Sequence, residues 1–355
     1  MLLILAALAQ AAVTLAALDV RWVVPLETPP VATPAYDATT AYVPLRGGTL
    51  VAVDLDRGQV RWRRDLATTL PPSVGSGLVF VAGDGVIEAL STDQGVTRWR
   101  TTVPGRLVTI TWDTDWLLFS NEAGDLAALR ASDGGLVWRA SLGAPLVLPP
   151  TPGLDRVYVG LVGGQLLSIE LATGTRAWAR TLPGRITGLK AADGQLIVGT
   201  TGNAVFSLDL ASGRQRWRWR VGGDVAGEAA SDERQIYFTA RDNMLRAVDL
   251  RSGNLRWKAE LPSRPVGGPQ VLAGRVVVPL STTVGIFDPH TGKPEAQVTV
   301  SGEMGAAPHL RVDGRPTSPR LVAITLDGRL QGFGWRYEEP PGRIQELPGQ
   351  AVPPE

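Results

Sequence analysis

The chain has 355 residues with a formal net charge of +1, 41 glycines, 27 prolines and no cysteine. A nearly balanced charge does not favour nucleic acid or an anionic surface as a partner. The lack of cysteine excludes disulfides, thiolate metal sites and thiol catalysis. The many Gly and Pro residues are typical of a chain with many turns.

The chain begins with an almost uniformly apolar stretch, residues 1–18. It is shorter than the roughly 20 residues that comfortably span a bilayer. It also contains small-residue cleavage candidates such as Ala9-Gln10-Ala11, as the hydrophobic region of a signal peptide does. No Lys or Arg precedes it, so a start further upstream stays open. We expect Sec-type export to a periplasmic or other extracytoplasmic location, with an uncleaved N-terminal anchor as the alternative.

The rest of the chain repeats one pattern, in which a Gly is followed four residues later by a Trp. The repeat tryptophans lie 37 to 40 residues apart and are Trp62, Trp99, Trp138, Trp178, Trp217 and Trp257. Trp22 lies 40 residues before the first of them, and a seventh copy, Gly292 to Ala296, keeps the spacing without the Trp. A period of this size indicates a repeat architecture in which each unit buries its apolar face against its neighbours.

Within each unit, short β-branched and aromatic runs alternate with two-residue turns. In one unit, Leu78–Val81 is followed by the turn Asp84-Gly85 and by Val86–Leu90. Such turns recur in register at Gly47-Gly48, Gly163-Gly164, Gly202-Asn203, Asp242-Asn243 and Asp327-Gly328. These dipeptides form type I′ or II′ hairpins. With a further strand in the Pro- and Gly-rich stretch before each unit, the repeat predicts four strands and hence a β-propeller blade.

The two ends of the repeat region complement each other. The last unit, residues 321–333, lacks a Trp-bearing fourth strand, and residues 20–24 form a Trp strand without partners. Seven whole units and one shared unit predict an all-β, eight-bladed β-propeller of four-stranded antiparallel blades, with the Trp22 strand closing the last blade. We assign the propeller to residues 19–336. The Pro- and Glu-rich residues 337–355 are expected to be a disordered tail.

The repeat tryptophans and Trp22 are interpreted as structural residues that pack between adjacent blades. Arg alternates with Trp on these strands, as in Arg61-Trp62-Arg63, so the two residue types face opposite sides. Exposed Arg on an outermost strand discourages edge-to-edge aggregation, and an Arg-lined partner surface is the alternative. Trp112 and Trp116 lie outside the repeat and are either interface anchors or core residues of the third blade.

No catalytic residue, cofactor site or metal site is predicted, and we do not expect an enzyme. The two histidines, His290 and His309, cannot form a multi-His zinc site. No nucleophile is marked near His309 for a Ser/His/Asp triad. The segment Asp54-Leu55-Asp56 begins like a calcium loop but lacks the downstream Glu of that motif, so a tight turn explains it.

Two segments, Ala52–Trp62 and Ala247–Lys258, resemble the repeat of pyrroloquinoline-quinone-type propellers, and the resemblance covers residues 19–335. Quinoprotein dehydrogenases and the periplasmic outer-membrane protein assembly factor BamB with its relatives share this repeat on eight-bladed rings. A resemblance to the dehydrogenases implies a quinone stacked on a Trp side chain in the central funnel, a bound Ca²⁺ and long loops inserted between blades. Here the blades are minimal, without long insertions or cysteines, so the chain more closely resembles the BamB group.

That resemblance implies a non-catalytic, exported scaffold that binds periplasmic domains of the central β-barrel assembly protein and assists outer-membrane protein insertion. In that group, connecting segments between mid-ring blades make the contact. The matching stretch here is Gly222–Ala226, which makes Asp224 a candidate partner-binding residue. Arg185 lies in another connecting segment, without clear register to the family pattern, and is the second candidate.

The chain departs from the BamB group in one respect. Members of that group are typically lipoproteins anchored by a Cys after the signal, and this chain has no such lipobox Cys. We therefore expect a protein that is soluble, held by its N-terminal segment or recruited by its partner. We also expect it to be a monomer. A general envelope binding or sensor propeller of unknown ligand is the alternative function, ahead of a quinone-dependent dehydrogenase.

Overall fold

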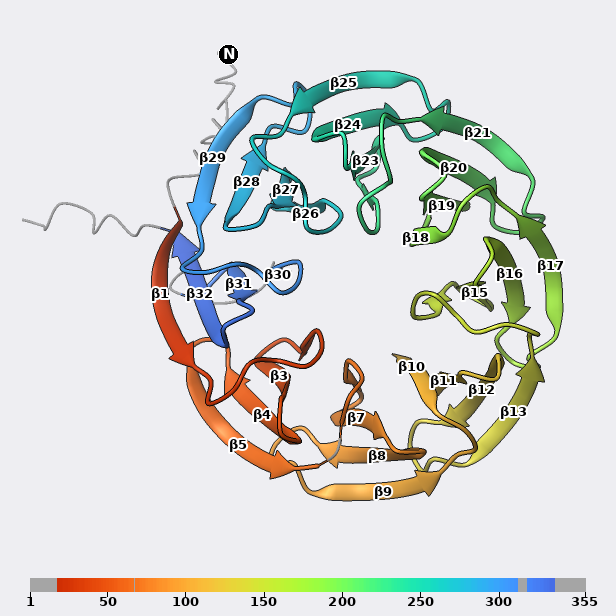
Figure 1. Cartoon of the computed structure of the whole chain (residues 1–355), viewed down its shortest axis with the longest axis vertical. Helices are drawn as coiled ribbons and strands as arrows, with labels where there is room; N and C mark the ends of the chain where they lie inside the picture. Colours follow the sequence, from red (N-terminus) through yellow and green to blue (C-terminus); the bar gives the residue numbers. More distant parts are fainter. Residues whose placement is uncertain (1–17, 67, 312–317, 336–355) are drawn as a thin grey trace, which may run out of the picture.

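Every regular element of the described chain is a β-strand. The computed structural model describes residues 18–66, 68–311 and 318–335. Within these ranges, 32 strands form eight four-stranded antiparallel sheets, which are arranged as blades around a central axis (Figure 1). The prediction of an all-β, eight-bladed propeller is confirmed. In the same ranges, no helix has the length and apolar character needed to cross a membrane.

Each blade runs from an inner strand, which is two or three residues long in six blades, to an outer strand of six to eight residues. In seven of the eight blades, strands that follow one another in the sequence are neighbours in the sheet. In seven of the eight blades the outer strand carries a Trp of the repeat series, Trp22 included. In the first four blades the strands, from inside to outside, are β2 (Ala35–Tyr36), β3 (Thr40–Leu45), β4 (Thr49–Asp54) and β5 (Gln59–Asp65); β6 (Ser73–Gly75), β7 (Leu78–Gly83), β8 (Val86–Ser91) and β9 (Thr97–Thr102); β10 (Leu107–Asp113), β11 (Trp116–Asn121), β12 (Asp125–Arg130) and β13 (Leu136–Ser141); β14 (Thr151–Pro152), β15 (Arg156–Gly160), β16 (Gln165–Glu170) and β17 (Arg176–Thr181).

The remaining blades repeat this arrangement. Their strands, in the same order, are β18 (Ile186–Ala192), β19 (Gln195–Thr200), β20 (Ala204–Asp209) and β21 (Gln215–Arg220); β22 (Ala230–Ser231), β23 (Gln235–Ala240), β24 (Met244–Asp249) and β25 (Leu255–Glu260); β26 (Gln270–Leu272), β27 (Arg275–Pro279), β28 (Thr283–Phe287) and β29 (Pro294–Thr299); β30 (His309–Leu310), β31 (Leu321–Ile324), β32 (Arg329–Trp335) and β1 (Leu18–Pro25).

The eighth blade combines strands from both ends of the described chain. Its sheet order is β1-β32-β31-β30, and β1 pairs antiparallel with β32 from Leu18 opposite Trp335 to Pro25 opposite Arg329. Figure 1 shows the red β1 lying along the outside of the blue β32. The predicted signal or anchor segment, except Leu18, and the predicted tail lie outside the described residues.

The repeat tryptophans dock on the glycine turn of the next blade. At seven blade boundaries of the described chain the indole ring lies against a Gly with positive φ, and a Cβ on that Gly would come 2.3 to 2.8 Å from the ring. Only glycine combines this backbone conformation with so close an approach. The pairs are Trp22 with Gly58, Trp62 with Gly95, Trp99 with Gly134, Trp138 with Gly174, Trp178 with Gly213, Trp217 with Gly253 and Trp257 with Gly292.

Six of these seven indole N–H groups also donate a hydrogen bond to a backbone carbonyl of the next blade's turn. Trp138, for example, donates to the Leu171 carbonyl at 2.7 Å. Trp217 is the exception, because its buried indole N–H has no hydrogen-bond partner among the residues that the structure describes. The equivalent carbonyl, that of Leu250, instead accepts a hydrogen bond from Gln195 Nε2 at 2.9 Å.

The boundary between blades 7 and 8 lacks this docking. Ala296 on β29 occupies the Trp position, and it packs against the apolar cluster between these two blades. In blade 8, the third and fourth strands come from opposite ends of the described chain. Within the described residues, no glycine turn therefore joins these two strands. Blade 7, whose outer strand has Ala296 in place of the Trp, thus packs against the blade that lacks the glycine turn on which a Trp would dock.

The apolar core is a ring of eight clusters, each lying between two neighbouring blades. The second and third strands of each blade supply most of the buried residues; between blades 2 and 3, for example, Phe80 and Ile87 pack against Leu117 and Phe119. Such burial stabilises by roughly 25 cal/mol per Å² of apolar surface. Each blade is therefore held by both of its neighbours.

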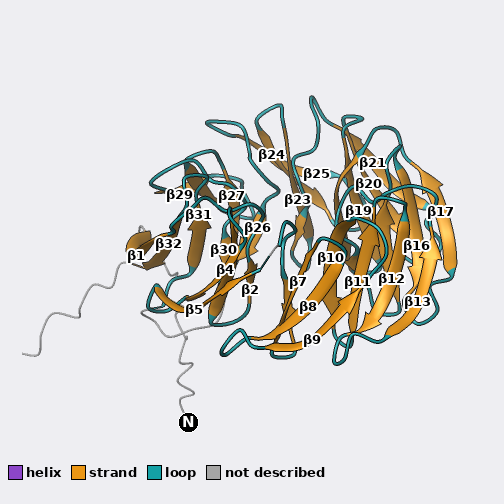
Figure 2. Cartoon of the chain, turned by 60° about the horizontal axis from the view of Figure 1, so that its bottom comes forward, coloured by secondary structure: helices purple, strands orange, loops and turns teal. Residues whose placement is uncertain are grey.

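The connections between strands alternate between two faces of the ring, because neighbouring strands are antiparallel. We call one of them the hairpin face: it carries the hairpins between second and third strands, such as residues 241–243, and the connectors between blades, such as residues 222–226. The turn face carries the other turns of each blade, such as residues 75–77 and 131–134. Figure 2 shows loops at both rims of the ring.

Candidate functional site

The two candidate partner-binding residues, Asp224 and Arg185, line one depression of about 510 Å³ on the hairpin face. The connectors that lead into blades 4 to 7 form this depression. Its lining also includes the cation Arg241 and apolar side chains such as Leu148 and Val266. The structure thus brings together two residues that lie one repeat apart in the sequence.

Asp224 and Arg185 occupy equivalent positions in consecutive connectors. The Asp224 carbonyl accepts a hydrogen bond from the Arg241 N–H at 2.8 Å, and the Arg185 carbonyl accepts one from the Thr201 N–H at 2.9 Å. The Arg185 N–H donates in turn to Thr201 Oγ1 at 2.9 Å. In both connectors, therefore, hydrogen bonds to the hairpin of the same blade hold the backbone in place.

The charged groups of this depression are available to a partner. Arg185 and Arg241 are exposed and Asp224 is half-buried. Within the described ranges, the charged groups of these three side chains have no hydrogen-bond or ion-pair partner. Val266 beside them is 43% exposed. Apolar surface bordered by charges of both signs is typical of a protein-binding surface.

A partly buried ion pair fixes the connector that carries Asp224. Asp242 accepts two hydrogen bonds from Arg246, at 3.0 and 2.6 Å, and one from the Gly222 N–H at 2.9 Å. The side chains of the pair are only 16% and 11% exposed. Partial burial by itself would raise the pKa of Asp242, but the hydrogen bonds from Arg246 and Gly222 outweigh it and hold this pKa below its ordinary value.

Sequence reasoning missed this pair and Arg241. The dipeptide Asp242-Asn243 indicated the hairpin, and Asn243 has the expected positive φ of 58°. The signal for the ion pair was Arg246 four residues later, which the hairpin brings back beside Asp242. The signal for Arg241 was its position at the hairpin tip, opposite the connector.

The described residues show no group of three or more His, Asp or Glu side chains that could hold a metal ion. His290 is exposed in a turn of the seventh blade. His309, on β30, stacks on Tyr36 of the first blade with the ring centroids 4.1 Å apart. The two histidines therefore lie in different environments and form no joint site.

Trp112 and Trp116, which lie outside the repeat, have different positions. Trp112 packs against the cluster between blades 2 and 3, so its role is in the core. Trp116 is half-buried, packs against the cluster between blades 3 and 4, and lines a cleft on the turn face.

Comparisons of the sequence identify the family. A family model described as outer membrane protein assembly factor BamB matches residues 11–111, 83–190 and 183–339. The protein of that name from Nitrosomonas eutropha is 31% identical over 190 residues, which are 50% of this chain and 46% of the relative. The one from Bordetella pertussis is 29% identical over 257 residues, which are 68% and 58%. The chain thus spans about half the length of the curated relatives that it matches.

Solved structures share the fold. BamB from Moraxella catarrhalis superimposes with a TM-score of 0.72 and 15% identity, over 89% of this chain and 99% of that one. Quinohemoprotein alcohol dehydrogenase from Comamonas testosteroni does so with a TM-score of 0.70 and 15% identity, over 95% and 79%. At these identities the likeness shows the fold alone, and the family follows from the sequence match. Because that match extends over nearly the whole ring, the chain belongs to the outer membrane protein assembly factor BamB family.

Proposed function

We propose that this protein is an exported, non-catalytic scaffold that assists the assembly of β-barrel proteins into the outer membrane. It acts from the periplasmic side, as a monomer, by binding a protein of the β-barrel assembly machinery. Membership of the BamB family supports this role. The observation that carries it is the depression in which Asp224 and Arg185 present charges beside apolar surface, without partners among the described residues.

The chemistry of the site favours binding over catalysis. Its charged groups have opposite signs and come from equivalent connector positions, and the hairpin behind them fixes the backbone of both. A partner with a basic group opposite Asp224 and an acidic group opposite Arg185 would gain two charge-assisted contacts around an apolar centre. Family members are named as assembly factors, and we propose no cofactor.

The first test is capture of a tagged chain from the cross-linked envelope of the native host, read by mass spectrometry. We expect enrichment of the β-barrel assembly machinery over an unrelated exported propeller. Failure to enrich it, with a different reproducible partner instead, would favour a general envelope binding or sensor propeller. Fractionation of the same cells tests the proposed periplasmic location.

Charge reversal at the depression tests the site. Asp224→Arg should weaken capture about tenfold or more, because reversing an interface charge replaces attraction by repulsion. Glu233→Arg is the matched control, since Glu233 is exposed on the turn face of the same blade. Unchanged capture by the Asp224 variant would remove this depression from the interface.

A further inference from the structure

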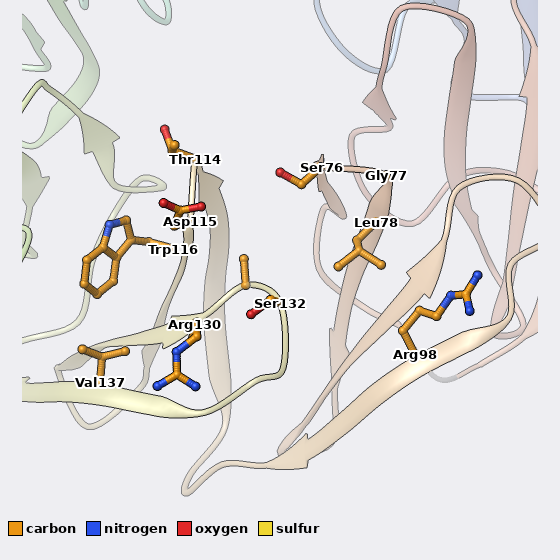
Figure 3. Close-up of a pocket in the computed structure, with 11 residues that line it drawn as sticks. Ser76, Gly77, Leu78, Arg98, Thr114, Asp115, Trp116, Arg130, Ser132 and Val137 are labelled. Atoms are coloured by element: carbon orange, nitrogen blue, oxygen red, sulfur yellow. The ribbon is translucent and has the colours of Figure 1, made fainter.

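A second cleft, of about 800 Å³, lies between blades 2 and 3 on the turn face, opposite the Asp224 depression (Figure 3). Blade 2 contributes Leu78 and Arg98 to its lining, and blade 3 contributes Asp115, Trp116 and Val137. The cleft can be compared with the same positions in other blades of the repeat. At three of its positions the residue, or the hydrogen bond or ion pair that it makes, differs from that found in several other blades.

The first difference is at Leu78, the first residue of its second strand. In blades 4, 5 and 6 this position holds Arg156, Gln195 and Gln235. Each of these side chains donates a hydrogen bond to a turn carbonyl of the following blade, at 2.8, 2.9 and 3.0 Å respectively. Leu78 cannot make such a bond, so the boundary between blades 2 and 3 lacks this bridge.

The second difference is at Arg98, which directly precedes the repeat Trp. In blades 1, 5 and 6 an Arg at this position pairs with an Asp at the end of the third strand. These pairs are Arg61–Asp54, Arg216–Asp209 and Arg256–Asp249, at 2.5 to 2.7 Å. Blade 2 has Ser91 in place of the Asp. Within the described ranges, the exposed Arg98 therefore has no hydrogen bond or ion pair within 4 Å.

The surroundings of Arg98 leave its charge available. Asp93 in the adjoining turn is the acidic group that its charge influences. A hydrogen bond from Ser91 is the main cause of the lowered pKa of Asp93, and the Arg98 charge adds a smaller effect. Since the two side chains form no ion pair, the guanidinium remains free to bind a carboxylate.

The third difference is at Val137, which stands in blade 3 where blades 1, 5 and 6 have the paired Arg. Val137 is 42% exposed and its neighbour Leu136 is 62% exposed. Arg130, at the position of the missing Asp, pairs instead with Asp133 at 2.5 Å. Val137 thus lines the cleft at a position where blades 1, 5 and 6 have a neutralised ion pair.

We propose that this cleft binds an extended peptide segment of a second protein, in which an apolar residue is flanked by an acidic and a basic residue. The apolar residue packs against Leu78 and Val137. The acidic group pairs with Arg98 and the basic group with Asp115, which Figure 3 shows on opposite sides of the cleft. The two charge contacts set the direction of the peptide, and the apolar contact supplies most of the affinity.

This site goes beyond the proposed function, because it lies on the opposite face of the ring from Asp224. A ring with binding surfaces on both faces can hold two partners at once. The proposal for each surface is tested by a separate experiment, so one proposal can fail while the other holds.

A random-peptide display library selected on the full-length chain tests the proposal. We expect enriched peptides to contain the acidic, apolar and basic residues in that order or its reverse. Arg98→Glu should convert the acidic preference to a basic one, and Asp115→Lys should do the opposite. A purely structural role would not invert the selection. For a synthetic peptide of the enriched sequence, Arg98→Ala should raise the Kd about tenfold or more.

Val137→Lys provides an independent variant, since it places a charge on the apolar wall of the cleft and should abolish enrichment. Arg61→Ala at the equivalent position of blade 1, and Asp224→Arg on the hairpin face, should leave the selection unchanged. Thermal unfolding midpoints establish that each variant is folded. No enrichment on the wild-type chain, or enrichment that survives both Arg98→Glu and Val137→Lys, overturns the proposal.

Discussion

At the scale of single residues, each repeat Trp can contribute to a blade boundary in two separable ways. The ring packs on a glycine of the next blade, and the indole N–H donates to a carbonyl of the same turn. Trp138 makes both contacts, whereas Trp217 makes only the first. Both side chains are 9% exposed, so the pair isolates the contribution of the hydrogen bond.

We expect Trp138→Phe to lower the free energy of unfolding by about 1 kcal/mol more than Trp217→Phe does. Both changes remove similar ring surface, but only the first removes a formed hydrogen bond. The second removes a buried donor that has no partner. Denaturant unfolding of the two variants, followed by Trp fluorescence and circular dichroism, measures the difference. Equal losses would show that the hydrogen bond contributes nothing measurable.

His309 makes the stability depend on pH. Burial, followed by the charge of Arg311, lowers the pKa of His309 to about 4, against a smaller opposing effect of Asp37. In the unfolded chain this imidazole titrates near pH 6.5. Between pH 6.5 and 4 the unfolded chain thus binds a proton that the folded chain does not. Stability therefore falls as the pH drops through this window, and the full stability is present above it.

We expect this loss to be on the order of 1–2 kcal/mol between pH 7 and pH 4, since His309 is half-buried. His309→Phe retains a ring that can stack on Tyr36 and removes the titrating group, so it should flatten this part of the pH profile. Thermal unfolding midpoints measured at several pH values compare the two proteins. His290→Phe, in an exposed turn, is the control and should leave the profile unchanged. An identical profile for the His309 variant would contradict the assignment.

At the scale of elements, connectors differ in how they are held. The connector with Arg185 uses a threonine hydroxyl, and the connector with Asp224 uses the carboxylate of Asp242. Because that carboxylate is mostly buried, Arg246 must remain beside it to balance its charge. The ion pair of one hairpin therefore determines the position of a loop in the proposed interface.

Arg246→Met should loosen this connector. Removing the cation leaves a mostly buried carboxylate unpaired, at a cost of about 1–3 kcal/mol, and weakens its hold on the Gly222 N–H. We expect amide hydrogen exchange in residues 222–226 to become about tenfold faster or more, with weaker partner capture. Arg256→Met breaks the Asp249 pair on the turn face of the same blade and is the control. Unchanged exchange in 222–226 would contradict the positioning role of Arg246.

At the scale of the whole molecule, stability depends on the closure of the ring. Seven boundaries of the described chain have a Trp docked on a glycine turn, and the boundary between blades 7 and 8 has Ala296 instead. Blade 8 is itself assembled from strands at both ends of the described chain. The region where the chain ends meet therefore lacks the contact that the other boundaries share.

Deletion of residues 19–25 should destabilise the ring and promote self-association. The deletion removes nearly all of β1, so β32 becomes an open edge with unpaired backbone groups. It also removes Trp22 from Gly58. Thermal unfolding and size-exclusion chromatography measure the two effects. Val23→Lys, at a position that is 46% exposed, is the control that keeps the strand. A truncated ring as stable as the intact one would show that β1 does not contribute to closure.

The repeat made the fold more predictable than the sites. Strand number and hairpin positions follow from the Gly-to-Trp spacing and from turn dipeptides such as Asp242-Asn243, because these features lie within one repeat. The blade count follows from the number of repeats and from the match between the two end units. The prediction that Asp224 binds a partner rested on the resemblance to a family. That it shares a depression with Arg185 and Arg241 could not be predicted, since the direction of each side chain depends on how the connector is fixed to its hairpin.

The sequence by itself determined the all-β class, the eight blades and the glycines at which the chain turns. The strands and turns depend on contacts within about 40 residues, and the blade count also depends on the two complementary end units, because residues 20–24 supply the Trp strand that the last unit lacks. Only the tertiary structure decided which residues of different repeats meet. It brought Asp224 and Arg185 into one depression, and within the described residues it left Arg98 unpaired beside the cleft between blades 2 and 3. The physical reason is that the ring brings equivalent positions of successive repeats together at each blade boundary, so departures from the repeat that lie about 40 residues apart in the sequence become neighbours in space.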